Sequence, residues 1–297
     1  MKRITGIFAP VATPFTKDGE IDWGAYAENM ASYDKTRLSG LVSLGSNGEF
    51  TMLSFEEKVA LVTATRKGLS SGKTVIAGTG CESLRETIAL TKACADAGAD
   101  AALVVTPNYY KKDMTDAALE KFFSMVADAS PIPVMLYNMP GNSGVNIPSA
   151  LTIRLSKHQN VTGIKDSGGN IVQIAEVLAG VDESFSVFAG SGSFLMATTL
   201  LGGVGGTLAL ANVVPNLCVD LYEASVARDI DRARKLQLDL MALNAAVTAK
   251  FGIGGMKAAM EMVGYRGGLP RLPILPATDE TKKAIRAILE RLGVAVR

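Results

Sequence analysis

Lys165 is the side chain in this sequence whose setting most favours reactivity. It ends the short apolar run Val161-Thr162-Gly163-Ile164, and in an alternating strand Lys165 and Gly163 share one face. If that face is the inside of a barrel, the lysine is desolvated and the neutral, nucleophilic amine is favoured, while Gly163 leaves room for a substrate. A strand-end lysine paired with Asp166 fits the same residues equally well.

Two further groups of polar residues end apolar runs. Tyr137 closes the run before that of Lys165, so its phenol could shuttle protons there, although a core tyrosine bonded to the backbone is the alternative. Ser46 and Asn47 lie in a glycine-flanked turn that could direct N–H groups and a hydroxyl at a carboxylate, or could simply join a strand to a helix. Glu49 ends this turn and is expected to cap or to form an ion pair.

The elements that must position these residues follow one recurring pattern. Short apolar runs that end in Gly, Pro, Ser or Asn alternate with amphipathic segments, and their spacing of roughly 20 to 35 residues is that of a βα unit. The runs cover residues 7–12, 41–44, 74–77, 101–105, 134–137, 162–165, 186–189 and 207–211. They lack strict alternation, as strands covered on both faces do. The pattern predicts a (β/α)8 TIM barrel over residues 1–214, with an open doubly wound sheet as the alternative. In such a barrel, chemistry lies at the carboxyl ends of the strands.

Helical spacing and caps predict the remaining elements. Outer helices are expected over residues 55–68, 84–97, 119–127 and 171–178, and Ser54 with Glu57 predicts a capping box for the first. Residues 215–297 carry no further strand signal. They predict a C-terminal helical extension packed on the barrel, with helices over 217–228, 230–249, 256–263 and 278–292.

Composition excludes several classes of protein. The 30 basic and 29 acidic residues leave a net charge of +1, which predicts neither a nucleic-acid nor a membrane partner. No apolar run approaches the roughly 20 residues of a membrane span. The three cysteines, Cys81, Cys94 and Cys218, argue against a disulfide framework, so we expect a cytoplasmic protein. The single histidine, His158, argues against zinc sites with several histidines and against most histidine-based triads.

Taken together, these motifs resemble those of a known family over essentially the whole chain. They are Gly6-Ile7-Phe8-Ala9-Pro10, the turn Gly45-Ser46-Asn47-Gly48-Glu49, Thr106-Pro107-Asn108-Tyr109, the strand end at Tyr137 and Gly163-Ile164-Lys165. In this order they resemble the dihydrodipicolinate synthase/N-acetylneuraminate lyase superfamily of pyruvate-dependent class I aldolases. The resemblance implies a TIM barrel, pyruvate or a related oxo acid as substrate, no cofactor and no metal, and a homotetramer built from tight dimers.

The resemblance also implies catalytic roles, residue by residue. Lys165 matches the lysine that forms a Schiff base with the ketone of pyruvate, and Tyr137 matches the tyrosine that relays protons to the adduct. Ser46 matches a hydroxyl of the same relay. Tyr109 matches a tyrosine that reaches across the tight dimer interface into the neighbour's relay.

Binding roles follow from the same resemblance. Ser46 and Asn47 match the site of the pyruvate carboxylate, largely through backbone N–H groups. Gly190 and Thr207 match positions whose backbone lines the pocket. Ser167, two residues beyond the lysine and on its face, could hydrogen-bond the distal end of the substrate.

Departures from the family pattern bear on the second substrate. Dihydrodipicolinate synthases typically have two threonines at the positions of Ser46 and Asn47, and an arginine at that of Asn142. Without this arginine, the carboxylate of aspartate semialdehyde loses a charge-assisted contact of about 1.5–3 kcal/mol.

Several segments instead resemble 4-hydroxy-2-oxoglutarate aldolases, which form pyruvate and glyoxylate. They are the turn that ends at Glu49, Ala77-Gly78-Thr79-Gly80-Cys81-Glu82-Ser83, Pro140-Gly141-Asn142-Ser143-Gly144, Lys165-Asp166-Ser167-Gly168-Gly169 and Asn244-Ala245-Ala246-Val247-Thr248. Three alternatives stay open: 4-hydroxy-tetrahydrodipicolinate synthase, a 2-keto-3-deoxy sugar-acid aldolase or N-acetylneuraminate lyase, and a non-catalytic barrel that binds an oxo acid.

Overall fold

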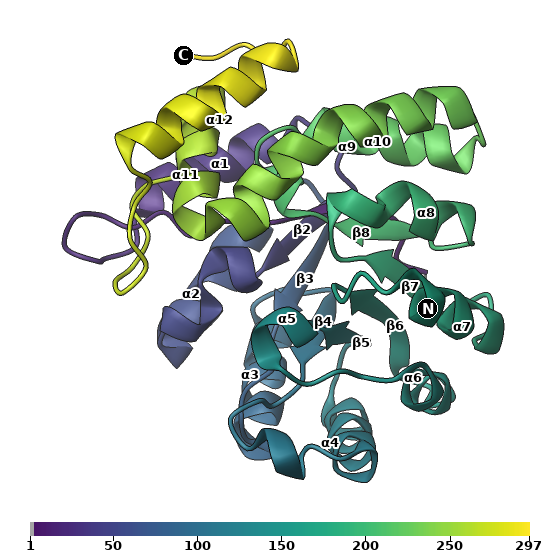
Figure 1. Ribbon diagram of the computed structural model, residues 1–297. Coiled ribbons are helices and arrows are strands. Elements are labelled where there is room, and N and C mark those ends of the chain that lie inside the picture. The colour runs from purple at the N-terminus through teal and green to yellow at the C-terminus, as the bar shows by residue number, and fades with distance from the viewer. Residues whose placement is uncertain (1–2) are drawn as a thin grey trace.

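Eight parallel strands close into a barrel in the computed structural model, which describes residues 3–297 (Figure 1). Each strand pairs with the next along the chain, and β8 returns to pair with β1. The strands are β1 (Gly6–Pro10), β2 (Gly40–Ser43), β3 (Thr74–Gly78), β4 (Ala101–Val105), β5 (Val134–Asn138), β6 (Val161–Asp166), β7 (Ser186–Ala189) and β8 (Gly205–Thr207). The predicted TIM barrel is confirmed, and the alternative of an open sheet is wrong.

The eighth strand is where the prediction fails. It covers Gly205–Thr207, and most of the predicted run 207–211 forms the 3₁₀ helix Ala209–Asn212 instead. A side chain on Gly205 would collide with the carbonyl oxygen of Gly6 on β1, so barrel closure requires a glycine there. A strand made of glycines has no apolar signature, whereas the buried 3₁₀ helix has one.

The inside of the barrel is filled by apolar and aromatic side chains from its strands. The buried members of this cluster are Phe8, Val42, Ile76, Ala101, Leu103, Met135, Tyr137 and Phe188. A Cβ on Gly163 would lie 2.6 Å from the carbonyl oxygen of Ser186. Gly163 therefore admits the close approach of β7, rather than leaving room for a substrate as predicted.

The outer helices follow the strands around the barrel (Figure 1). They are α1 (Trp23–Asp34), α2 (Phe55–Lys67), α3 (Leu84–Asp96), α4 (Asp116–Ala129), α5 (Pro140–Ser143), α6 (Ser149–Leu155), α7 (Ile171–Gly180) and α8 (Leu195–Leu200). The capping box of Ser54 and Glu57 at the start of α2 is confirmed. The short helices α5 and α6 were not predicted, because too few turns are present for a periodic pattern.

The C-terminal part is helical, as predicted. It contains α9 (Pro215–Val226), α10 (Ile230–Ala245), a π-helical turn (Ala246–Lys250), α11 (Gly252–Val263) and α12 (Asp279–Arg291). Helix α9 packs on β1 and α8, and α10 packs on α9 and on the 3₁₀ helix after β7. Figure 1 shows α9, α10, α11 and α12 gathered on one side of the barrel. The boundary at residue 214 stays a prediction.

Candidate active site

Lys165 and Tyr137 face each other at the carboxyl ends of two neighbouring strands. They are direct partners in the pairing of β5 and β6. The ammonium nitrogen of Lys165 lies 4.0 Å from the centroid of the Tyr137 ring. Only 3% of Lys165 and 5% of Tyr137 is exposed. Lys165 is therefore a buried amine beside a phenol, the arrangement that Schiff-base chemistry requires.

Asp166 does not pair with Lys165, so the alternative of a strand-end ion pair is wrong. Its carboxylate accepts hydrogen bonds from the side chains of Asn138, at 2.8 Å, and Gln173, at 3.1 Å. It also accepts the backbone N–H of Gly168 at 2.8 Å. These bonds fix the turn that follows β6 without neutralising the Lys165 amine.

A hydroxyl network begins at Tyr137. The hydroxyl oxygens of Ser46 and Tyr137 lie 3.2 Å apart, within hydrogen-bonding distance. Burial acts to raise the pKa of Tyr137, but the nearby charge of Lys165 and the hydrogen bond with Ser46 outweigh it, so the pKa is lowered. A phenol with a lowered pKa exchanges its proton more readily near neutral pH.

The turn that carries Ser46 is a single 3₁₀ turn, Ser46–Gly48, just beyond β2. It is closed by the N–H of Glu49, which donates to the carbonyl of Ser46 at 3.1 Å. The side-chain amide of Asn47 donates to the sulfur of Met256 at 3.0 Å, so it reaches helix α11. If Asn47 binds the pyruvate carboxylate as predicted, it does so through its backbone N–H.

Ser167 and Gly190 lie side by side next to this centre. The N–H of Gly190 donates to the carbonyl of Asp166 at 2.6 Å, and a side chain on Gly190 would collide with the Ser167 hydroxyl. That hydroxyl is buried and has no hydrogen-bond partner of good geometry among residues 3–297. Its proximity is one of the smaller causes that lower the pKa of Tyr137, so the Ser167 hydroxyl lies next to the phenol. Thr207 is buried at the end of β8.

Tyr109 and Asn142 are both exposed on the surface of the described chain. Tyr109 is 78% exposed, packs edge-on against Tyr110 with 5.1 Å between ring centroids, and makes no hydrogen bond to Tyr137 within the described chain. Asn142 is exposed on the short helix α5. A role for Tyr109 requires a second subunit.

Two amide side chains of α10 were missed as site residues. Gln237 donates to the carbonyl of Gly192 at 2.7 Å and accepts the N–H of Met196 at 3.1 Å. Asn244 donates to the hydroxyl of Ser191 at 3.2 Å. The two amides are seven residues apart, two helical turns, and so hold the loop after β7 from one helix face. Besides this spacing, the sequence signals Asn244 only as part of the segment Asn244–Thr248, which resembles 4-hydroxy-2-oxoglutarate aldolases.

Lys111 was also missed. Its side chain lies over Gly144, at the end of α5, where an added Cβ would be 3.0 Å from the ammonium nitrogen. Gly144 has a positive φ of 68°, which favours a residue without a side chain. No carboxylate within residues 3–297 forms an ion pair with Lys111. It is thus a cation beside the helix that carries Asn142.

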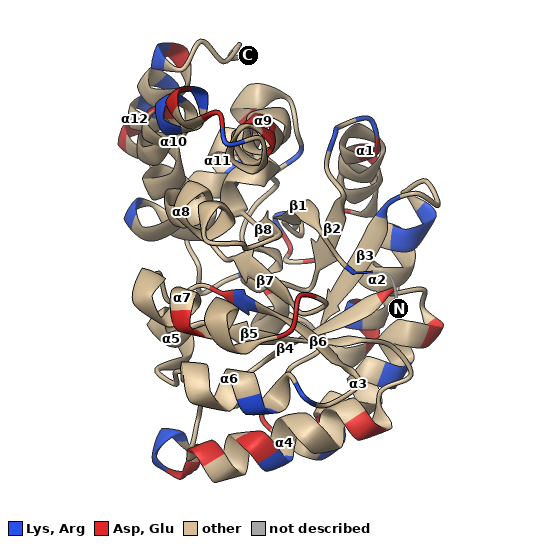
Figure 2. Cartoon of the chain, turned by 90° about the vertical axis from the view of Figure 1, so that its right-hand side faces the viewer, with Lys and Arg blue, Asp and Glu red and all other residues tan. Residues whose placement is uncertain are grey.

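Charges elsewhere are mixed. On the face shown in Figure 2, basic and acidic residues intersperse along α4. Over the described residues, no three Cys, His, Asp or Glu side chains are grouped to hold a metal ion. None of the helices in this part of the chain has the length and apolar character to cross a membrane.

Comparison with known proteins places this geometry among enzymes. The chain is 36% identical over 288 residues to a probable mitochondrial 4-hydroxy-2-oxoglutarate aldolase of Emericella nidulans, covering 95% of this chain and 93% of that protein. It is 38% identical over 283 residues to an L-threo-3-deoxy-hexylosonate aldolase of Hypocrea jecorina, covering 91% and 90%. A solved dihydrodipicolinate synthase of Acinetobacter baumannii, complexed with pyruvate, superposes with a TM-score of 0.92 at 30% identity, covering 98% and 99%.

The family follows from the extent of these matches. Residues 3–292 match the model of the dihydrodipicolinate synthetase family, so the match includes the whole barrel and almost all of the C-terminal helices. The predicted resemblance is confirmed. With a buried lysine and a tyrosine at the carboxyl ends of neighbouring strands, this chain belongs to the dihydrodipicolinate synthetase family of carbon–carbon lyases.

Proposed function

We propose that this protein is a class I aldolase that cleaves 4-hydroxy-2-oxoglutarate to pyruvate and glyoxylate. The observation that carries the proposal is the buried amine of Lys165, 4.0 Å from the ring of a tyrosine whose hydroxyl contacts that of Ser46. A buried amine next to a proton relay is the equipment for forming and breaking an imine.

The reaction can be written with these groups alone. The Lys165 amine adds to the ketone of the oxo acid, Tyr137 gives a proton to the departing oxygen, and water leaves to form a protonated imine. The bond between C3 and C4 then breaks, its electron pair moves into the imine, and the Tyr137 phenolate takes the proton of the C4 hydroxyl. Glyoxylate leaves, Tyr137 protonates the enamine at C3, and water hydrolyses the pyruvate imine to regenerate the amine and the phenol. The scheme uses no metal or other cofactor.

The distal end of the substrate distinguishes the candidates. 4-Hydroxy-2-oxoglutarate ends in a carboxylate. We expect this carboxylate to be bound by the hydroxyl of Ser167, two residues beyond Lys165, and by the ammonium of Lys111, which lies over Gly144 at the end of α5. Asn142 provides no charge of the kind that an aspartate-semialdehyde carboxylate needs. We therefore place 4-hydroxy-tetrahydrodipicolinate synthesis second.

A 3-deoxy sugar acid is the other candidate substrate. It is favoured by the similarity to the deoxy-hexylosonate aldolase, and by the hydroxyl and amide groups of Ser191 and Asn244 near the loop after β7. Such groups suit the hydroxyls of a sugar chain better than a carboxylate.

A complete site is proposed to need two subunits. The exposed Tyr109 would enter the relay of a neighbouring subunit in a tight dimer, two of which form the homotetramer. Backbone groups of Ser46, Asn47, Gly190 and Thr207 would line the pocket for pyruvate. A cytoplasmic location is retained as a prediction from the sparse cysteines.

Pyruvate release, coupled to lactate dehydrogenase, tests the substrate. We expect fast release from 4-hydroxy-2-oxoglutarate and slow release from 2-keto-3-deoxygluconate, and the reverse result would assign the protein to sugar-acid cleavage. Borohydride should trap pyruvate on Lys165, and Lys165→Ala should abolish both trapping and turnover. A wild-type protein that traps no pyruvate would be a non-catalytic oxo-acid-binding barrel.

A further inference from the structure

A buried ion pair lies behind the active site and takes no part in the proposed chemistry. The ammonium of Lys257, on α11, lies 2.6 Å from the carboxylate of Glu49, and the exposed fractions of the two residues are 1% and 3%. Burying two charges costs several kcal/mol per ion unless their remaining hydrogen-bonding capacity is satisfied. The contacts of each residue therefore show what the pair holds in place.

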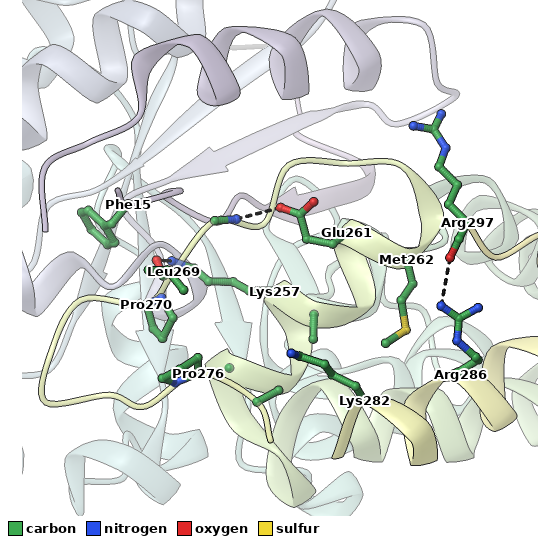
Figure 3. Close-up of a pocket in the computed structure, with 14 residues that line it drawn as sticks. Phe15, Lys257, Glu261, Met262, Leu269, Pro270, Pro276, Lys282, Arg286 and Arg297 are labelled. Carbon is green, nitrogen blue, oxygen red and sulfur yellow. Dashed lines mark hydrogen bonds between the residues drawn. The ribbon is translucent and has the colours of Figure 1, made fainter. Parts of the chain in front are cut away.

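Lys257 joins the end of the first strand to the C-terminal segment. Its ammonium donates to the carbonyl of Thr13 at 2.7 Å and to that of Leu269 at 2.6 Å. It also lies 4.7 Å from the centroid of the Phe15 ring. Figure 3 shows Lys257 extending from its helix toward Leu269 and Phe15, along the wall of a surface pocket. The ammonium thus donates two hydrogen bonds to carbonyl groups and is in ion-pair contact with Glu49.

Glu49 is held in a conformation that it does not favour. Its φ is 57°, in the left-handed region, which is unfavourable for a residue with a side chain. Its second carboxylate oxygen accepts the backbone N–H of Arg271 at 2.8 Å. The pair with Lys257 and this hydrogen bond fix the side chain, and so fix the backbone from which it extends.

That backbone closes the turn of Ser46. The N–H of Glu49 donates to the carbonyl of Ser46, and the carbonyl of Gly48 accepts the hydroxyl of Thr13 at 2.8 Å. Thr13 is the residue whose own carbonyl is bound by Lys257. The ion pair therefore holds the turn from two sides, through Glu49 directly and through Thr13.

We propose that Glu49 and Lys257 are positioning residues that set the Ser46–Gly48 turn to receive the carboxylate of the oxo acid. The inference rests on the proposed function, since it assumes that this turn binds the carboxylate. It assigns α11, a helix outside the barrel strands, a part in substrate binding.

A double variant separates positioning from simple stabilisation. In Glu49→Gln/Lys257→Met both charges are removed and both shapes are kept, and replacing a buried ion pair in this way is often neutral for stability. A purely structural pair therefore predicts a folded protein with unchanged affinity for pyruvate. A positioning pair predicts a folded protein whose half-saturating pyruvate concentration in borohydride trapping rises about tenfold, the loss of one charge-assisted contact.

Two further variants complete the experiment. Glu120→Gln breaks the ion pair of 2.9 Å between Glu120, on α4, and Arg154, on α6, and should leave pyruvate affinity unchanged. Thr13→Val removes only the hydroxyl that binds Gly48, and should weaken pyruvate binding even if the double variant does not fold.

The outcomes distinguish the two proposals. If the folded double variant binds pyruvate with wild-type affinity, the positioning role is overturned and the proposed aldolase function stands. If the double variant does not fold, wild-type pyruvate affinity in Thr13→Val has the same consequence. Failure of the wild-type protein to trap pyruvate overturns the proposed function itself. An equal loss of affinity in Glu120→Gln would also contradict the positioning role, because it would show that the loss of any ion pair has the same effect.

Discussion

Individual side chains at the site differ in what they contribute. In the proposed mechanism, Lys165 provides the amine and Tyr137 relays the proton, and the hydroxyl of Ser46, 3.2 Å from the phenol, adjusts how readily that proton moves. Lys111, which lies over Gly144, is expected to attract the distal carboxylate of the substrate. Substitutions of Ser46 and of Lys111 test these roles.

The first concerns the pH dependence of turnover. The hydrogen bond with Ser46 is one of the interactions that lower the pKa of Tyr137, so its removal in Ser46→Ala should raise that pKa. The alkaline limb of kcat, where the phenol loses its proton, should then move to higher pH, while kcat falls about 10²-fold as the relay is interrupted. Ser46→Thr keeps the hydroxyl and should keep the wild-type profile. An alkaline limb that stays in place in Ser46→Ala would show that Tyr137 does not control it.

The second concerns Lys111. Its contact with a substrate carboxylate would be exposed, and exposed ion pairs are worth up to about 1 kcal/mol, so Lys111→Ala should raise KM for 4-hydroxy-2-oxoglutarate about two- to fivefold. Trapping of pyruvate, which lacks the distal carboxylate, should be unchanged. Lys112→Ala is the matched control, and an equal effect there would indicate general attraction of anions.

At the scale of elements, register and loop anchoring position the site. A register shift between Val134 and Met135 in the pairing of β5 with β6 brings Tyr137 opposite Lys165. On the other side of the site, α10 holds the loop after β7 with two amides. Helices outside the barrel strands therefore influence a pocket that the strands define.

This anchoring predicts the effect of Asn244→Ala. We expect this loop to contact the part of the substrate that pyruvate lacks, so loss of one hydrogen bond of about 1 kcal/mol should loosen the loop at Ser191 and raise KM for the full substrate about fivefold. Binding of pyruvate should change little. Leu238→Ala, on the exposed side of the same helix at 66% exposure, is the control. Similar losses for pyruvate and for the full substrate would contradict a role confined to the distal end.

Two exposed tyrosines indicate how whole molecules assemble into an oligomer. Tyr109 and Tyr110 expose 78% and 68% of their surface, which is unusual for aromatic rings unless a partner covers them. In the proposed tight dimer, each subunit would complete the relay of the other. A defect in Tyr109 would then appear in the neighbour's site.

Mixing two inactive variants tests this arrangement. Tyr109→Phe should lose most activity, and Lys165→Ala should lose all of it. A hybrid dimer of the two has one site with an intact Lys165 and a neighbour's intact Tyr109, so mixing under exchange conditions should restore activity. Mass spectrometry should confirm that hybrids form. If such hybrids recover no activity, or if Tyr109→Phe alone is fully active, Tyr109 is not part of the relay.

Much of the barrel and the centre of its site could be predicted because their signals are local. Seven apolar runs overlap the observed strands, and Ser54 begins α2 with the expected capping box. Lys165 and Tyr137 could be paired because the ends of consecutive parallel strands meet at one rim. These features depend on alternation, helical spacing and caps, which operate over a few residues along the chain.

What the tertiary structure alone decided depends on distant parts of the chain. Lys257 binds the carbonyl of Thr13, 244 residues away in sequence, and pairs with Glu49, whose partner could not be predicted. The position of β8 also became clear only on closure, since Gly205 is explained by its contact with Gly6 on β1. Local sequence patterns were enough to predict the barrel and to place Lys165 beside Tyr137. The contacts that hold the Ser46–Gly48 turn and the loop after β7 depend on packing, because a buried charge or amide takes whichever partner the closed fold brings within hydrogen-bonding distance.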